Sequence, residues 1–243
     1  MKLVTKTLLG AGLVCVLIAV TVVLALQMMN HHQIMNAEVP VNEPSVETST
    51  EPENDIITVG GVVDTAIDLS NPQALATESA YIALARIDAI DDTNNYSEIS
   101  QQYVLPYAFG QMTVLENYKG ELTLGEKCGF YRLGGTLPAE QYYAGVLPPE
   151  ANAKRQAMQA ENGESDAGKY VRDLAVGDIE IEAGKAYLVY LVPENSYYGK
   201  PDTYAIIGYQ GGLREARQRD GVWQVLNNFT GEWEDLAVIL GKV

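Results

Sequence analysis

The chain of 243 residues contains 32 Asp and Glu residues but only 16 Lys and Arg residues, which gives a formal net charge of −16. This acidity argues against nucleic acid as a partner, because the phosphate backbone is also negatively charged. The two cysteines, Cys15 and Cys128, lie in regions of different character, so we expect no disulfide within the chain.

The N-terminal segment predicts a membrane anchor. Lys2 and Lys6 precede an apolar run that is long enough to cross the hydrocarbon core as a helix. Because positive charge stays on the cytoplasmic side, we expect residues 1–7 in the cytoplasm and residues 8–29 as a transmembrane signal anchor. The protein is then a single-pass protein of the cell membrane with its C-terminal domain outside.

A cleaved secretory signal is the alternative to this anchor. The small side chains of Val23-Leu24-Ala25 are compatible with a cleavage site. However, the apolar run over residues 8–26 is longer than the ~7–15-residue core of a typical signal peptide. We therefore expect an uncleaved anchor.

Two regions of different composition follow the anchor. Residues 30–56 are rich in Pro, Glu, Ser, Thr and Asn, which predicts a disordered acidic stalk. Residues 57–243 have the length of one domain with a core of its own. We expect an extracytoplasmic β domain here, with a helical insertion near residues 148–162 that Gly163 ends.

The pattern beyond the stalk is mostly that of short strands. Asn71-Pro72 is typical of a helix start, and residues 80–90 predict a strand that the polar residues 91–95 interrupt. Apolar runs predict further strands over 103–118 (with bends at Pro106 and Gly110), 126–133, 179–192 (with a turn at 183–185), 204–209, 223–226 and 236–240. The fold class we expect is mainly β, a small antiparallel OB-like barrel or sandwich with one or two short helices.

Four stretches carry a resemblance to known proteins, namely SAYIALARI (79–87), TVLENYKG (113–120), AGKAYLVYL (183–191) and GYQGG (208–212). In these stretches the chain resembles uncharacterised membrane-anchored or secreted proteins of Gram-positive bacteria with an OB-fold-like barrel. The layout is also similar to netrin-like barrels, which include metalloproteinase inhibitors. Those inhibitors use a free N-terminal cysteine and several disulfides, so inhibition does not follow from the resemblance.

Few residues suggest chemistry. Both histidines, His31 and His32, precede the β domain, so a Ser-His-Asp or Cys-His mechanism within it is excluded. Cys128 is expected to be a buried core residue. Gly211-Gly212 predicts a tight turn, because the further Gly and Lys of a phosphate-binding loop are missing. The sequence assigns no catalytic residue and no cofactor.

The acidic residues leave a metal site open. Asp178, Glu180 and Glu182 alternate with apolar residues, so on a strand they would share one face. Such a face could bind calcium or supply paired carboxylates for glycoside hydrolysis, but a solvated strand face has the same pattern. The Asp91-Asp92-Thr93-Asn94 segment lacks the spacing of a calcium loop and is expected to be a plain turn.

The tyrosines, among them Tyr142, Tyr143, Tyr197 and Tyr198, are compatible with a glycan- or peptide-binding face as well as with barrel packing. The leading hypothesis is a single-pass membrane protein that displays a β-barrel interaction domain to a protein or cell-envelope partner. The alternatives are a cell-envelope hydrolase with paired carboxylates and a calcium-dependent binding module.

Overall fold

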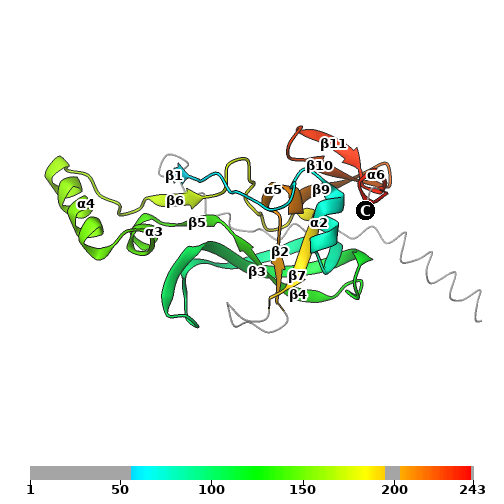
Figure 1. The fold of residues 1–243 in the computed structure, drawn as a ribbon, viewed down its shortest axis with the longest axis horizontal. Coiled ribbons are helices and arrows are strands. Elements are labelled where there is room, and N and C mark those ends of the chain that lie inside the picture. The colour runs from blue at the N-terminus through cyan, green and yellow to red at the C-terminus, as the bar shows by residue number, and fades with distance from the viewer. Residues whose placement is uncertain (1–55, 195–202, 242–243) are drawn as a thin grey trace, which may run out of the picture. The chain divides into compact units, whose positions relative to one another are not determined.

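The computed structural model describes residues 56–194 and 203–241. The predicted anchor (8–29), most of the stalk (30–56) and residues Cys15, His31, His32, Tyr197 and Tyr198 lie outside these ranges. Within the described ranges, no helix has both the length and the apolar character needed to cross a membrane. The described part is mainly β, as the sequence predicts, but it contains five helices where one or two are expected (Figure 1).

Five strands close into a ring. They are β2 (Tyr81–Ser97), β3 (Gln102–Lys119), β4 (Lys127–Leu133), β8 (Thr203–Ile206) and β7 (Ala186–Pro193), each hydrogen-bonded to the next. Pairing of β7 with β8 closes the ring, because β7 also pairs with β2. β4 and β8 run parallel, so the ring is mixed and the expectation of a purely antiparallel sheet is wrong.

Three more strands extend the large sheet from β7. These are β9 (Leu213–Arg219), β10 (Val222–Asn227) and β11 (Glu232–Asp235), all antiparallel. A separate sheet has the order β1 (Ile56–Val59), β6 (Tyr170–Asp173), β5 (Gly135–Pro138). The helices are α2 (Pro72–Glu78), α3 (Ala139–Val146), α4 (Pro149–Asn162), α5 (Tyr209–Gly212) and α6 (Leu236–Leu240).

The core has two layers because the central strands are buried on both faces. Ala83, Ala85 and Ile87 of β2 pack in a cluster with Phe130 and Leu191. The alternate residues of β2, Ile82 and Leu84, pack in a second cluster that includes α2 and α6 side chains. Burial of both faces explains why β2 and β7 read as continuous apolar runs rather than as alternating ones.

The sequence misses the length of β2. The strand does not stop at residues 91–95 but continues to Ser97, paired with β3 through several register shifts. The polar side chains find partners within β2 and on the helix α3. Asn95 is fully buried and its Nδ2 donates to the Gln141 carbonyl at 3.2 Å, while Asn94 Oδ1 accepts from the backbone N–H of Tyr96 at 3.0 Å. Pairing with β3, together with these side-chain contacts, outweighs the local turn signals.

Two other apolar runs differ from prediction. Residues 179–182 form no strand, and only the second half of the predicted 179–192 strand becomes β7. Residues 236–240 form helix α6 instead of a strand, because a five-residue apolar run fits either structure. The predicted helix start is confirmed, since Asn71 Oδ1 accepts from Gln73 N ahead of α2.

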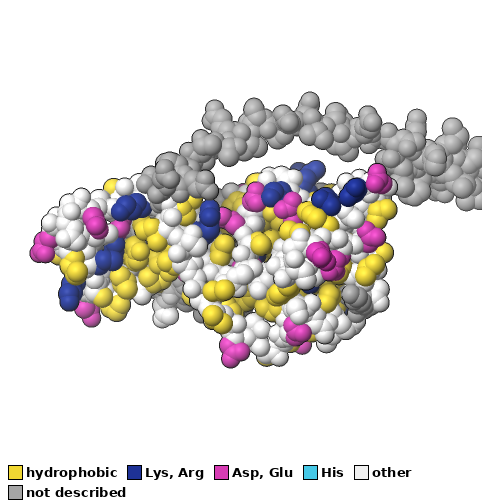
Figure 2. All heavy atoms as spheres, turned by 90° about the horizontal axis from the view of Figure 1, so that it is seen from above, with side chains coloured by type: hydrophobic (Ala, Val, Ile, Leu, Met, Phe, Trp, Pro, Cys, Tyr) yellow, Lys and Arg dark blue, Asp and Glu magenta, His cyan; other side chains and the backbone are white. Residues whose placement is uncertain are grey.

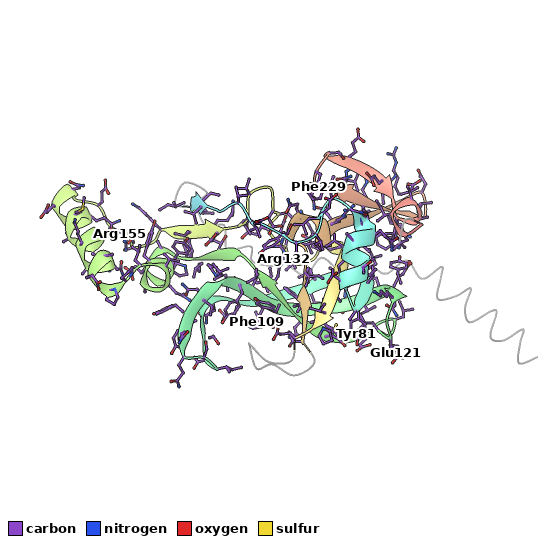
Figure 3. The ribbon with its side chains drawn as sticks, in the orientation of Figure 1. Tyr81, Phe109, Glu121, Arg132, Arg155 and Phe229 are labelled. Atoms are coloured by element: carbon purple, nitrogen blue, oxygen red, sulfur yellow. The ribbon has the colours of Figure 1, made fainter. Side chains whose placement is uncertain are left out.

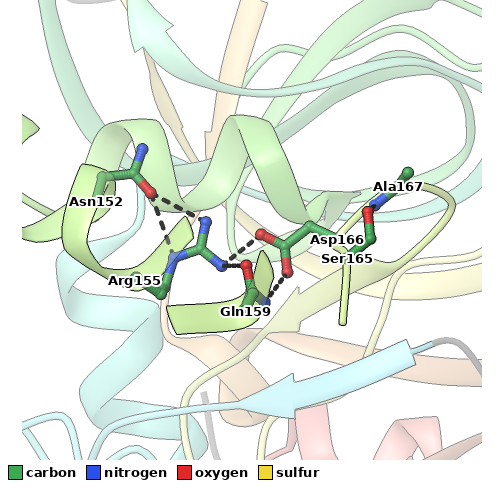
Figure 4. Close-up of polar contacts among 6 residues, drawn as sticks. All are labelled: Asn152, Arg155, Gln159, Ser165, Asp166 and Ala167. Carbon is green, nitrogen blue, oxygen red and sulfur yellow. Dashed lines mark hydrogen bonds and ion pairs between the residues drawn. The ribbon is translucent and has the colours of Figure 1, made fainter. Parts of the chain in front are cut away.

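The segment between β4 and β7 carries the helices α3 and α4. α4 begins at Pro149, buries none of its residues, and ends at Gly163, which has the left-handed φ of 74°. Polar contacts hold it to the following loop (Figure 4). Arg155 contacts Asp166, Gln159 Nε2 donates to Asp166 Oδ1 at 2.7 Å, and the Arg155 guanidinium lies 3.9 Å from the centre of the Tyr143 ring.

Candidate functional site

Two adjoining cavities lie where the end of β4 meets the turn after β8. The larger has a volume of about 220 Å³ and the smaller about 150 Å³, and Leu133 and Tyr209 line both. The larger is otherwise lined by Tyr131, Arg132, Ala205, Ile206, Ile207 and Gly208, and the smaller by Gly61, Val63, Leu105, Pro106, Gly134, Asp173 and Ala175. We call the two cavities together the Tyr209 site.

A glycine-rich turn positions Tyr209. Gly208 has a left-handed φ of 84°, and a Cβ at Gly212 would lie 1.6 Å from the carbonyl oxygen of Ile207, so no side chain fits there. Tyr209 itself has a φ of 45°, a region that an aromatic residue rarely adopts. The tight turn predicted from Gly211-Gly212 is thus present. Backbone strain of this kind gathers at functional positions, because the surrounding structure must hold it.

A buried ion pair lies beside Tyr209. Arg132 Nη2 is 2.5 Å from Asp178 Oδ1, and the two side chains are only 3% and 1% exposed. Asp178 Oδ1 also accepts from the backbone N–H of Ile179 at 2.9 Å. Figure 3 shows Arg132 near the centre of the domain. Among the described residues, neither Arg132 Nε nor Asp178 Oδ2 has a hydrogen-bond partner.

The charges of Arg132 and Asp178 affect each other and the Tyr209 hydroxyl. Burial raises the pKa of Asp178 above its ordinary value, although the Arg132 charge acts in the opposite direction. Burial likewise raises the pKa of Tyr209; the Asp178 charge raises it further, and Arg132 lowers it. The Tyr209 hydroxyl is therefore protonated at neutral pH and remains a hydrogen-bond donor.

Exposed apolar side chains lie at or next to the lining of the smaller cavity, and we call them the rim. Leu105 is 65% exposed, and Val62 and Val176, which adjoin lining residues in the chain, are 89% and 63% exposed. The Val176 N–H donates to the Gly61 carbonyl at 3.0 Å, which brings the two loops together. Figure 2 shows hydrophobic side chains gathered between charged groups on one face of the domain. An exposed apolar surface next to a cavity is typical of an interaction site.

The three predicted acidic residues do not form one face. Asp178 pairs with Arg132, Glu180 Oε2 lies 2.8 Å from Arg172 Nε, and Glu182 Oε1 lies 2.7 Å from Lys185 Nζ. The expectation of a shared strand face is wrong, because residues 179–182 pair with no strand and each carboxylate turns to its own cation. Within residues 56–194 and 203–241, no cluster of three metal-ligating side chains is found.

The other predicted candidates lie elsewhere. Cys128 is 4% exposed in the core, and burial raises the pKa of its thiol to about 12, so it is a packed residue. The Asp91–Asn94 segment lies within β2 and is not a turn. Tyr142 and Tyr143 stack edge to face on α3 and line neither of the two cavities.

Comparison with known proteins gives no assignment. No protein-family model matches this chain. A search of curated proteins finds no match either. The site is therefore interpreted from its geometry alone.

The sequence contained only part of the signal for this site. Asp178 belongs to the predicted acidic face and the GYQGG stretch predicts a turn, but neither pattern indicates Arg132. A single arginine within the apolar FYRL run of β4 was the available clue, since a charged residue in a buried strand needs a buried partner. The apolar rim comes from the start of β3 and two loops far apart in sequence, and no local pattern identifies it.

Proposed function

We propose that residues 57–243 form an extracytoplasmic interaction domain, held at the cell membrane by residues 8–29, which binds a protein or cell-envelope partner through the Tyr209 site. The lysines before the apolar run support the topology. The observation that carries the binding function is the exposed apolar rim of Val62, Leu105 and Val176 around cavities that a strained tyrosine lines.

The strand order supports an OB-like barrel. In chain order the ring strands are β2, β3, β4, β7 and β8, and around the ring they follow the order first, second, third, fifth, fourth. OB-folds are five-stranded Greek-key barrels that bind ligands on the face of the second and third strands and on nearby loops. The Tyr209 site includes Leu105 and Pro106 of β3 and Arg132 of β4, so its position agrees with that face. This agreement is an analogy of fold and supports the location, not the ligand.

A charge in the rim tests the proposal. The full chain is solubilised with mild detergent from the envelope of its own cells, and the size of the complex that contains it is measured. A Leu105→Glu or Val176→Glu substitution is expected to reduce the complex to the size of the free protein, because a buried unpaired carboxylate opposes docking. Val222→Glu is the matched control on β10, where Val222 is 49% exposed. Equal complexes for all three variants would contradict the proposal.

The topology has a separate test. Protease added to intact cells is expected to digest the domain and leave an N-terminal fragment that contains residues 1–29. A domain that is digested only after the cells are lysed would show that the predicted orientation is wrong. Mass analysis of the mature N-terminus distinguishes an anchor from a cleaved signal.

A further inference from the structure

We propose that the Tyr209 site binds a cationic, amphipathic segment of a protein partner, with aliphatic side chains against the rim and a lysine or arginine at Asp173. This inference rests on the function proposed above and names the chemistry of the partner. Three features of the described residues support it: the position of Asp173 beside the rim, the sign of the charge in the rim segments, and the lining of the smaller cavity.

Strand pairing places Asp173 between the segments that form the rim. Its strand β6 lies between β1 and β5, and Asp173 is paired with Val59 at the end of β1, just before the first rim loop. On its other side Asp173 is paired with Gly135. The neighbouring Gly134 N–H donates to the Pro106 carbonyl at 2.7 Å, which joins this sheet to the start of β3. Asp173 itself lines the smaller cavity.

The charge in the rim segments has one sign. These segments contain aspartates but no lysine or arginine, and they are residues 59–64, 102–108 and 173–178. Asp178 is neutralised by Arg132, whereas neither Asp64 nor Asp173 forms an ion pair with a described residue. The domain as a whole is also acidic, since residues 57–243 contain 26 acidic and 14 basic residues. A cationic partner is therefore favoured both during its approach and at the site.

Asp173 is the one charged residue among those that line the smaller cavity. It is half-buried, and its carboxylate accepts a hydrogen bond from the Tyr142 hydroxyl. Burial raises the pKa of Tyr142 to about 12, and the Asp173 charge and this hydrogen bond act in the same direction, so the hydroxyl remains a donor that orients the carboxylate. A carboxylate has about four acceptor positions, so Asp173 can still accept from a ligand.

A lysine side chain fits this combination of surfaces. Its aliphatic stem can pack along an apolar surface while its ammonium group stays at a polar edge. Leu105 and Pro106 line the smaller cavity, of about 150 Å³, and would contact the stem, while Asp173 would accept from the ammonium. The adjoining cavity of about 220 Å³, lined by Leu133 and Ile206 among others, would take a neighbouring aliphatic side chain. Asp173 would repel an anionic ligand.

The test uses the full chain in micelles of an uncharged detergent and measures peptide binding by saturation-transfer NMR. The probe is acetyl-Ala-Leu-Lys-Leu-Ala-amide, whose blocked ends leave the lysine as its one charge. Two analogues have norleucine or glutamate in place of the lysine, and a third has the lysine between glycines instead of leucines. We expect the probe to bind with a dissociation constant of about 1 mM or below, and the norleucine peptide to bind about fivefold more weakly. The glutamate and glycine peptides should bind more weakly still.

Matched variants locate the preference for lysine. Asp173→Asn keeps an acceptor for Tyr142 but removes the charge, so the lysine and norleucine peptides should bind it equally. Asp64→Asn, at an exposed loop position next to the lining residue Val63, should reduce the preference without removing it. Asp220→Asn is the control. It removes the same charge from a side chain that is 94% exposed and lines neither cavity, so it should keep the preference.

Other outcomes overturn the inference. If the preference survives in both Asp173→Asn and Asp64→Asn, or is lost to the same extent in Asp220→Asn, the lysine is not recognised at this site. Wild-type binding of the norleucine or glutamate peptide as tight as that of the probe would refute a cationic ligand, and equal binding of the glycine peptide would refute an amphipathic one. If no peptide binds but the rim variants still break the envelope complex, the ligand class is wrong and the proposed function stands. If the rim variants have no effect either, both are wrong.

Discussion

The Arg132–Asp178 pair gives the sharpest prediction about the energetics of the site. Two unit charges at their separation of 2.5 Å attract by about 7 kcal/mol at an effective dielectric constant of about 20. Removal of both charges from water costs several kcal/mol per ion, so the intact pair contributes little net stability. Loss of one partner leaves the other charge buried without a counterion.

We therefore expect Arg132→Met and Asp178→Asn each to lower the free energy of unfolding by about 3–5 kcal/mol. The double variant should lose no more than either single variant, because it buries no unpaired charge. Glu180→Gln is the matched control. Its ion pair with Arg172 is about one third exposed, and we expect a change of about 1 kcal/mol or less.

The assay is urea unfolding of the full chain in detergent, followed by tryptophan fluorescence. Both tryptophans, Trp223 and Trp233, lie in the described β10 and β11 strands and report on the folded domain. The reasoning would be refuted if Asp178→Asn cost less than about 1 kcal/mol, or if the double variant lost the sum of the two single losses.

Three further predictions concern the structure around the site. Gly212→Ala should lower the free energy of unfolding by about 3 kcal/mol or more in urea unfolding, because its Cβ would lie 1.6 Å from the Ile207 carbonyl oxygen; an unchanged midpoint would contradict this. Cys128, whose thiol pKa is raised to about 12 by burial, should resist iodoacetamide in the folded protein and react in urea, as measured by peptide mass spectrometry. Asp166→Asn should speed hydrogen exchange in α4. Burial raises the pKa of Asp166, but hydrogen bonds from Gln159 and Arg155 bring it below 3.8. In the wild type, the protection of the α4 amides from exchange is therefore present above pH 3.8 and is lost as the pH falls through the lower pKa of the folded state. A variant whose exchange shows the same acid dependence as the wild type would exclude Asp166 as the source of that protection.

The elements that the sequence predicted well are those whose signal is local and strong. β3 and β4 follow apolar runs close to their full length, and α4 occupies the stretch where helix-favouring residues end at Gly163. Local sequence patterns do not predict a strand whose formation depends on pairing with another part of the chain. Residues 179–182 alternate as a strand would, but no neighbouring strand pairs with them, so alternation alone could not produce one.

The candidate site was predictable only in part for the same reason. Asp178 stood out as an acidic residue, but its partner Arg132 is 46 positions away, and the alternation pattern placed it on a solvated face. The rim residues Val62, Leu105 and Val176 are unremarkable in sequence and become a surface only when two loops meet the start of β3. Burial and proximity of this kind arise from topology, which composition and spacing do not encode.

Photo-cross-linking in intact cells tests the central claim, that the Tyr209 site binds the partner, most directly. A photoreactive phenylalanine is placed at Val62 or Leu105 on the rim, and at Val222 or Val238 as controls on β10 and α6 that are about half exposed. The account predicts that both rim positions form the same cross-linked product and that the control positions do not form it. Cross-links from Val222 or Val238 with none from the rim would place the interaction elsewhere and contradict the account.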